Sequence, residues 1–570
     1  AFMGCDQITE IVLPDSITFI SDLAFSYCSN LKSINIPQNV TMVEQGVFDG
    51  CINLTNIDIA DDATGIRVDC GLRSTAYFKD ESNWENGVLY IGKHLISTEN
   101  CTLESYSVKE GTRDIICARG NIKNLSIPSS VTSIDRDCLD IFDTIKVDSK
   151  NKVYDSRDNC NALIDTATDT MIYAGRNAKI PNTVKNIGSG AFFCHNELKN
   201  IIIPQNIINI GNGAFANCEN LITAYISDGV KNIYGAFSMC NKLENVRLPE
   251  SIINIGSDTF FGCKSLENIT LPKNVQSIGR EAFLDCTSLE NMVIPENVSK
   301  IDQSAFYGCS ALKAIKVDAS NKTYDSRDNC NAIIESSTGS LLYGCENSFI
   351  PNGVTKICSH AFGDVTEFNK LVIPNSVIKI ENDAFNHYNE SDTSCAVEEL
   401  YIGNNVDSLE NLPIGENLKT CIIGSSITEI PDYCFSHCHQ LANISIPNSV
   451  TKLGHGAFYD CKFSDIKIPN KVSYIPKSAF FSCDKLKSIS IPSSVTNIDK
   501  GAFRECDNLK DVYYQGSKED WKKISIEDNN YDLLNATIHY NNEKTYTVEY
   551  NKTNKQTKQT NKQTKNSFKL

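Results

Sequence analysis

Several features typical of enzymes and membrane proteins are missing from this chain. No run of about 18 apolar residues, the length that a membrane-spanning helix needs, occurs in its 570 residues. It also lacks a P-loop, a glycine-rich dinucleotide fingerprint, a G-x-S-x-G elbow and an H-E-x-x-H motif. Its eight histidines are scattered along the sequence, and none is paired with a candidate nucleophile in a catalytic motif. We therefore expect no catalytic residue, no cofactor, no resident metal and no transmembrane segment.

Basic charge is also scarce. Lysine and arginine together number 53 against 70 aspartates and glutamates, which gives a net charge of −17 and a pI of about 5.0. Affinity for nucleic acid comes largely from the neutralisation of phosphates by basic side chains. The composition therefore argues against a nucleic-acid partner, and any electrostatic contribution to binding should favour basic proteins.

What the chain does contain is a phenylalanine at almost constant intervals. Steps of 22 or 23 residues separate the members of three runs, which are Phe2, Phe25, Phe48; Phe192, Phe215, Phe237, Phe260, Phe283, Phe306; and Phe435, Phe458, Phe480, Phe503. A fixed period in the twenties is typical of a solenoid, in which each repeat buries its apolar side by stacking on its neighbours. We expect Phe215 to Phe306 to form one interior column, and we call each repeat a rung.

Each rung follows the pattern A-F-x-x-C-x-x-L-x-x-I-x-I-P-x-x-V-x-x-I. The alternation in I-x-I predicts a short strand with one buried face. Proline, which has no N–H to donate, then ends that strand, and V-x-x-I supplies a second extended piece. Polar residues before Ala-Phe predict a short helical or 3-10 turn. The fold class is therefore α/β: a right-handed, β-rich leucine-rich-repeat solenoid of about 23 residues per rung.

The residues between the apolar strand positions should face outward and align between rungs. An asparagine column (Asn245, Asn268, Asn291) and an acidic column (Glu244, Glu267, Glu290) follow from the spacing. These columns fit a polar binding strip, with Arg247 as a candidate anchor. They fit equally a solvated strand face on which stacked asparagines bond one another, so the binding residues stay unassigned.

Twelve of the 24 cysteines lie three residues after a repeat phenylalanine: Cys5, Cys28, Cys51, Cys218, Cys240, Cys263, Cys286, Cys309, Cys438, Cys461, Cys483 and Cys506. Such an inward position suits a free thiol that behaves as a small apolar side chain. Parallel stacked side chains also do not meet the geometry of a disulfide. We expect reduced, inaccessible thiols, which suit an anaerobe or a reducing compartment.

One short cluster contains possible zinc ligands. Cys434, His437, Cys438 and His439 lie within six residues, and both residue types bind zinc. However, Cys434 and Cys438 occupy inward positions of the rung, and a structural zinc site usually needs two separated ligand pairs. We therefore do not expect this quartet to bind a metal.

The consensus resembles the BspA-like leucine-rich repeats of the Treponema pallidum type over most of residues 1–540. Residues 81–90 (ESNWENGVLY) resemble an insertion of bacterial members, and the segment from Val512 to Tyr540 resembles their C-terminal end unit. The resemblance implies a surface or secreted protein that contacts host matrix proteins or other cells.

A longer duplication lies on top of the rungs, because Tyr154 to Ala162 (YDSRDNCNA) recurs as Tyr324 to Ala332. These copies predict a hairpin, with either a binding role or a local structural role for their Asp, Ser and Asn side chains. The expected organisation is repeats with a truncated start (1–64), an irregular insertion (65–120), repeats with hairpin-like insertions at about 148–180 and 318–350 (121–510), a C-terminal cap (511–545) and a disordered basic tail (546–570).

Three functions remain consistent with the sequence. The favoured one is a non-catalytic protein-binding solenoid, a cell-surface or secreted adhesin for host or neighbouring-cell proteins. The alternative is an intracellular scaffold for a cytosolic partner, which the free thiols would suit. A third is that the repeats decorate a larger polypeptide, because residues 1–5 (AFMGC) already form part of a rung and we expect residues before them.

Overall fold

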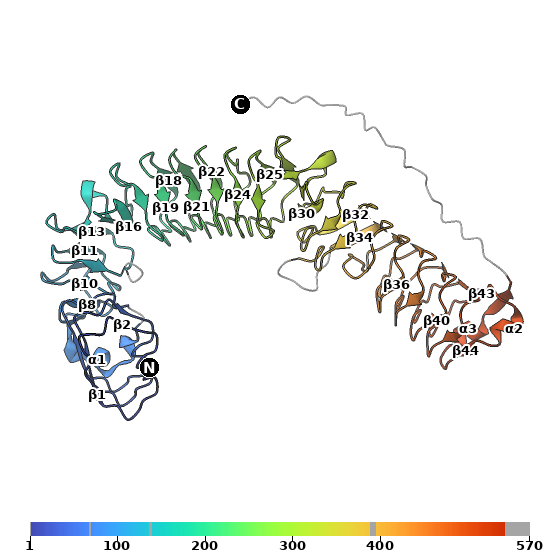
Figure 1. Ribbon diagram of the computed structural model, residues 1–570, viewed down its shortest axis with the longest axis horizontal. Helices are drawn as coiled ribbons and strands as arrows, with labels where there is room; N and C mark the ends of the chain where they lie inside the picture. The colour runs from blue at the N-terminus through green and yellow to red at the C-terminus, as the bar shows by residue number, and fades with distance from the viewer. Residues whose placement is uncertain (1, 68–69, 136–138, 388–394, 542–570) are drawn as a thin grey trace. The chain divides into compact units, whose positions relative to one another are not determined.

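The computed structural model describes residues 2–67, 70–135, 139–387 and 395–541. Short strands joined by turns recur throughout, and the strands of successive rungs lie side by side (Figure 1). The chain divides into two compact units. Unit 1 contains Ala1–Ser337 and Leu342–Ser348, and unit 2 contains Thr338–Leu341 and the residues from Phe349 onward. We describe each unit by itself.

One rung of unit 1 shows how the sequence pattern becomes structure. Strand β25 (Asn291–Ile294) pairs in parallel with β27 (Ala314–Val317) of the next rung, with Asn291 opposite Ala314. Pro295 follows directly and its carbonyl accepts a hydrogen bond from Val298 N (3.3 Å). The chain then enters β26 (Lys300–Ile301), which pairs in parallel with β24 (Ser277–Ile278) of the preceding rung. Each rung therefore contributes to two parallel ladders.

The remaining parallel strands repeat this arrangement. In unit 1 they are β1 (Glu10–Ile11), β2 (Phe19–Ile20), β3 (Ser33–Ile36), β4 (Met42–Val43), β5 (Asn56–Ile59), β9 (Ser105–Ser107), β10 (Asp114–Ile115), β11 (Asn124–Ile127), β12 (Ser133–Ile134), β13 (Thr144–Val147), β17 (Asn186–Ile187), β18 (Asn200–Ile203), β19 (Asn209–Ile210), β20 (Thr223–Ile226), β21 (Asn232–Ile233), β22 (Asn245–Arg247) and β23 (Asn254–Ile255). In unit 2 they are β31 (Lys356–Ile357), β32 (Glu367–Val372), β33 (Lys379–Ile380), β34 (Ala396–Tyr401), β35 (Thr420–Ile422), β36 (Glu429–Ile430), β37 (Asn443–Ser445), β38 (Lys452–Leu453), β39 (Asp465–Lys467), β40 (Tyr474–Ile475), β41 (Ser488–Ile491), β42 (Asn497–Ile498), β43 (Asp511–Tyr514), β44 (Ser525–Ile526) and β45 (Thr537–Tyr540).

The Ala-Phe segment of each rung is a series of tight turns. Leu284 N donates to Glu281 O (3.2 Å) and Cys286 N to Phe283 O (3.1 Å), which are the i→i+3 bonds of 3-10 geometry. Glu281 and Asp285 have φ values of 55° and 58°, in the left-handed region that aspartate and asparagine tolerate best among non-glycine residues. Because Phe283 N also donates to Ala305 O of the next rung (2.8 Å), hydrogen bonds link the rungs along this side as well.

The repeat phenylalanines form an interior column, as the period predicts. Phe215, Phe237, Phe260, Phe283 and Phe306 stack with ring centroids 5.5, 5.9, 5.3 and 5.5 Å apart and are at most 1% exposed. In unit 2 the rings of Phe435, Phe458, Phe480 and Phe503 stack at 5.4, 5.3 and 5.1 Å. The chain is therefore a leucine-rich-repeat solenoid in which each rung covers the apolar face of its neighbour.

The expectation of free ladder thiols is confirmed. All twelve ladder cysteines are unbridged; eleven are buried and Cys5 is half-buried. Ten of them donate the thiol hydrogen to the carbonyl of the repeat phenylalanine one rung earlier, at 3.0 to 3.2 Å; these are Cys28, Cys51, Cys218, Cys240, Cys263, Cys286, Cys309, Cys461, Cys483 and Cys506. Outside this ladder, Cys117 is disulfide-bonded.

Antiparallel strands and short helices interrupt the repeats. Antiparallel pairs involve β6 (Trp84–Glu85), β7 (Val88–Ile91), β8 (His94–Ser97), β14 (Tyr154–Asp155), β15 (Ala162–Asp165), β16 (Thr170–Ala174), β28 (Tyr324–Asp325) and β29 (Ala332–Glu335), and β30 (Ser340–Gly344) follows β29 in the same sheet. The strands β8, β16 and β30 also pair in parallel with a strand of the next rung. The helices are η1 (Leu72–Ser74), α1 (Ala76–Lys79), η2 (Glu81–Asn83), η4 (Arg157–Asn159), η5 (Arg327–Asn329), α2 (Lys518–Trp521) and α3 (Tyr531–Asn535). The domain boundaries given above stay a prediction, and the tail at 546–570 lies outside the described residues.

The two copies of the duplicated segment have closely similar local structures. Arg157 Nε donates to Asp155 at 2.9 Å, and Arg327 Nε donates to Asp325 at 2.8 Å. The hydroxyls of Ser156 and Ser326 accept hydrogen bonds from the backbone of the preceding strand, at Val147 and Val317. These side chains are engaged within their own segment, which favours the local structural role over the binding role.

Candidate protein-binding face

On one side of unit 1 the strands β18, β20 and β22 form one sheet and β25 and β27 form another, with one rung that lacks a strand between them (Figure 1). Inward and outward residues alternate along these strands, as in the buried-exposed pattern of β25. One outward column contains Asn200, Thr223, Asn245, Asn268, Asn291 and Ala314. The second contains Ile202, Tyr225, Arg247, Thr270, Val293 and Lys316. We call these two columns together the outer strand face.

The two predicted columns behave differently. Asn245, Asn268 and Asn291 are all exposed, and Asn291 Nδ2 donates to Asn268 Oδ1 at 3.4 Å. For Asn268 and Asn291, this bond between neighbouring rungs favours the interpretation that stacked asparagines have a structural role. Glu244 and Glu267 are exposed, so the negative charge of the acidic column is available to solvent.

The third member of the acidic column is already paired. Glu290 is half-buried and forms an ion pair of 2.8 Å with Lys313 of the next rung. It also raises the pKa of Lys313, through a hydrogen bond and charge attraction. The acidic column therefore contains two exposed glutamates, Glu244 and Glu267, and one glutamate, Glu290, that forms an ion pair with the next rung.

The second column carries exposed apolar residues, of which Val293 was expected to face outward from the strand pattern, whereas Ile202 and Tyr225 were not singled out. The side chains of Ile202, Tyr225 and Val293 are 67%, 44% and 53% exposed. The signal was present in the sequence, since each occupies the middle position of I-x-I, where other rungs have Thr270 or Lys316. Arg247, which the sequence did identify, is exposed between Tyr225 and Thr270 in this column.

Two shallow recesses lie on this side of unit 1. One, of about 200 Å³, is lined by Tyr225, Asn245, Val246, Asn268, Ile269 and Thr270. It lies at the rung that has no strand, where Asn268 forms only an isolated bridge with Asn291. The other, of about 420 Å³, is lined by Glu250, Leu271, Lys273, Val293, Pro295, Glu296 and Asp318. The outer strand face thus combines an exposed tyrosine, an exposed arginine and two shallow recesses.

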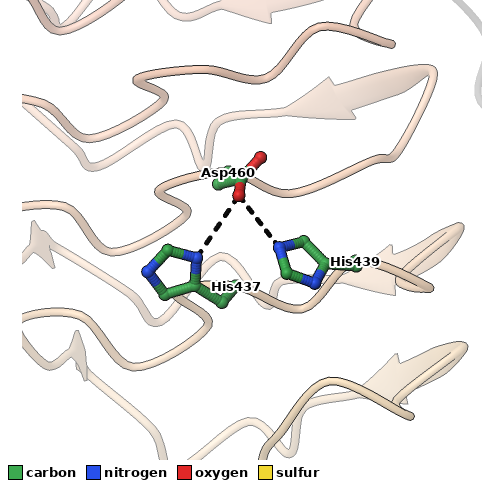
Figure 2. Close-up of side chains that lie close together, drawn as sticks. All are labelled: His437, His439 and Asp460. Atoms are coloured by element: carbon green, nitrogen blue, oxygen red, sulfur yellow. Dashed lines mark hydrogen bonds and ion pairs between the residues drawn. The ribbon is translucent and has the colours of Figure 1, made fainter.

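The structure separates the Cys/His quartet of unit 2. Cys438 is buried in the thiol ladder, whereas His437 and His439 lie on the surface with side chains 54% and 41% exposed. Both rings converge on Asp460 of the next rung (Figure 2). Sequence reasoning missed Asp460, although its offset of 23 residues from His437 matches the repeat period.

Asp460 is held by two kinds of contact. Its Oδ2 lies 2.9 Å from His439 Nε2 and 3.3 Å from His437 Nδ1, and Lys462 Nζ donates to its Oδ1 at 2.6 Å. Partial burial acts to raise the pKa of Asp460, but the hydrogen bonds from Lys462 and His439 outweigh it and lower that pKa to about 2. The carboxylate is therefore ionised across the physiological range.

Within the described residues, no helix has the length and apolar character needed to cross a membrane.

The repeated rungs place the chain in the class of leucine-rich-repeat proteins, and comparison with known families narrows this. The model of the BspA-type leucine-rich repeat region matches residues 1–118, 174–235, 234–338, 334–413 and 414–531. These ranges cover most of the sequence. The chain therefore belongs to the BspA-type leucine-rich-repeat family.

Solved structures of bacterial repeat proteins are similar to this chain. A leucine-rich cell surface protein from Faecalibacterium prausnitzii is 26% identical, with 66% of this chain and 96% of that chain covered and a TM-score of 0.36. A leucine-rich-repeat protein from Eubacterium ventriosum is 22% identical, with 53% and 83% covered and a TM-score of 0.34. The leucine-rich-repeat protein of T. pallidum is 17% identical, with 48% and 79% covered and a TM-score of 0.18. No curated protein matches the chain.

Proposed function

We propose that this protein is a non-catalytic, protein-binding solenoid that acts at the cell surface or after secretion. Its partners are proteins of a host or of neighbouring cells, and the outer strand face of unit 1 is the binding surface. The observation that carries the proposal is the exposed column with Ile202, Tyr225 and Arg247. Tyrosine and arginine are enriched among the residues that dominate binding energy at protein interfaces.

The repeat architecture supports this assignment. Isolated exposed apolar residues are ordinary on a protein surface. Here, however, Ile202 and Tyr225 lie on adjacent paired strands, with Ile202 directly opposite Tyr225 in the ladder. Arg247 is opposite Tyr225 on the next strand. Three consecutive rungs therefore present an aliphatic, an aromatic and a cationic side chain in one row.

The test is a binding screen with the full chain against matrix proteins, intact cell surfaces and glycans. For the partner found, Tyr225→Ala and Arg247→Ala should each weaken binding by about tenfold or more, as anchor residues do. Tyr531→Ala is the matched control, because Tyr531 is 67% exposed but lies on α3 of unit 2. Binding that is insensitive to both unit 1 variants would contradict the proposed surface.

A second candidate, an intracellular scaffold for a cytosolic partner, is favoured by one observation. Twenty-two of the cysteines in the described part of the chain carry no disulfide, and such usage is typical of reducing compartments. The disulfide at Cys117 favours an oxidising location instead. Failure to bind any extracellular protein, combined with specific recovery of a cytosolic partner through Tyr225 and Arg247, would favour the scaffold.

A further inference from the structure

The solenoid stacks three potential metal ligands on two adjacent rungs of unit 2. His437 precedes the ladder residue Cys438, and Asp460 precedes the corresponding Cys461. Both have left-handed backbones, with φ values of 59° and 56°. Because His437 and Asp460 hold equivalent positions one period apart, their side chains project from the surface next to each other. His439 follows Cys438 and reaches the same point from the other side (Figure 2).

Hydrogen bonds between rungs fix the backbone that carries these side chains. His437 N donates to Tyr459 O at 2.8 Å, and Asp460 N donates to Phe481 O at 2.7 Å. The ring of Tyr459 also meets the ring of His437 edge to face, with centroids 5.2 Å apart. Two of the ligands are therefore supported by the repeat scaffold itself, which reduces the ordering that an ion must impose.

The distances match those between ligands of one ion. Asp460 Oδ2 lies 3.3 Å from His437 Nδ1 and 2.9 Å from His439 Nε2, and all three ligand atoms lie within 4.8 Å of one another. Zinc binds imidazole nitrogen and carboxylate oxygen at about 2.0–2.2 Å. Two such ligands at a tetrahedral angle are about 3.3 Å apart. The contact between His439 and Asp460 is therefore about 0.4 Å shorter than this spacing and must lengthen by that amount when an ion enters.

The neighbouring charges orient the carboxylate. Lys462 Nζ lies 2.6 Å from Asp460 Oδ1 and 3.0 Å from Asp484 Oδ1. This contact occupies the oxygen of Asp460 that faces away from the histidines and leaves Oδ2 directed at them. Outer contacts of this kind position metal ligands in known sites. Asp484 balances the charge of Lys462, so Asp460 retains a local negative charge for a cation.

We propose that His437, His439 and Asp460 bind one divalent transition-metal ion of the zinc type at the surface of unit 2. Imidazole nitrogen favours zinc, copper and nickel, whereas calcium and magnesium prefer all-oxygen sites. Three protein ligands leave at least one coordination position for water or for a ligand from outside. The buried thiol of Cys438 takes no part, in contrast to the quartet considered from sequence alone.

The test is a titration of the full chain with Zn²⁺ in competition with a chromophoric chelator. The wild type should bind one equivalent that His437→Ala, His439→Ala and Asp460→Asn each weaken by at least about tenfold, since even the loss of outer contacts costs that much. His539→Ala is the matched control, because His539 Nε2 pairs with Asp511 Oδ1 at 2.7 Å without a second histidine. This variant should bind zinc as the wild type does.

Cobalt provides an independent readout of the ligands. Co²⁺ in the proposed site should show d–d absorption without the intense charge-transfer band of a cobalt thiolate. A thiolate band would assign the metal to the cysteines and overturn the proposal. Wild-type zinc affinity in the three ligand variants, each shown to be folded by circular dichroism, would overturn it equally, as would the absence of a stoichiometric zinc equivalent in the wild type.

Discussion

The thiol of Cys286 donates a hydrogen bond of 3.2 Å to the carbonyl oxygen of Phe260, one rung earlier in the solenoid. The same carbonyl accepts the backbone N–H of Cys263 at 3.1 Å. One buried oxygen is thus satisfied by a bond within its rung and a bond from the next. A thiol can donate this hydrogen bond only while it keeps its proton. Ionisation of a ladder cysteine would therefore break a hydrogen bond between two rungs.

The first prediction concerns the accessibility of these thiols. Ellman's reagent should react with few cysteines in the native protein and with many after denaturation, because 19 of the 22 free cysteines among the described residues are buried and the other three, Cys5, Cys194 and Cys434, are half-buried. Burial also raises the pKa of Cys263 and Cys286 well above the ordinary thiol value, so the reactive thiolate is scarce. Mass spectrometry after rapid alkylation would contradict this if it found rung-to-rung disulfides.

The second prediction concerns alkaline pH. Burial raises the pKa of Cys51, Cys218 and Cys483 to about 12, whereas an unfolded thiol ionises at about 8.5. Above pH 8.5 the unfolded chain therefore binds fewer protons than the folded chain, and the free energy of unfolding falls as pH rises toward 12. Below pH 8.5 these thiols add no pH dependence.

Urea unfolding at a series of pH values measures this effect. Each contributing thiol adds a slope of up to about 1.4 kcal/mol per pH unit. Cys483→Ala should therefore show a shallower alkaline decline than the wild type, since one ionising thiol is removed from the unfolded state. Identical slopes in the two proteins would mean that Cys483 does not contribute to the loss.

The third prediction concerns the phenylalanine column. Phe283→Ala should lower the free energy of unfolding by about 3–5 kcal/mol, because it removes a fully buried ring that contacts Phe260 and Phe306 and leaves a cavity. Val293→Ala is a suitable control in the same rung, since Val293 is 53% exposed, and surface changes usually stay within about 0.5 kcal/mol. Hydrogen exchange should show that the rungs next to Phe283 loosen first.

The repeat period was sufficient to predict the rungs, the phenylalanine column and the free thiols, because stacking makes each inward position equivalent to the one a period away. It was not sufficient for the surface. The period places Ile202, Tyr225 and Arg247 in one outward row, but nothing inside a rung indicates which outward side chains contact a partner. The period aligns Asp460 with His437, but it does not predict that the side chain of His439 reaches the same carboxylate, because that depends on the side-chain directions at the turn.

The last prediction concerns binding by the outer strand face as a whole. Deleting residues 250–272 removes one 23-residue period and joins Pro249 to Lys273, which keeps the sequence pattern in phase. Because each rung contacts mainly its neighbours, the flanking rungs should restack and the protein should stay folded. The deletion removes Asn268 and Thr270 from the face but keeps Tyr225 and Arg247, so binding should weaken in part and not disappear.

A deletion of residues 470–492 in unit 2 is the matched control, because it also removes 23 residues and joins Pro469 to Ser493. It should leave partner affinity at the wild-type level. Surface plasmon resonance with the partner from the binding screen, alongside circular dichroism of both deletions, compares the two. Equal losses in both would indicate that affinity depends on the solenoid's general integrity, whereas a partial loss confined to the unit 1 deletion places the contact on the outer strand face.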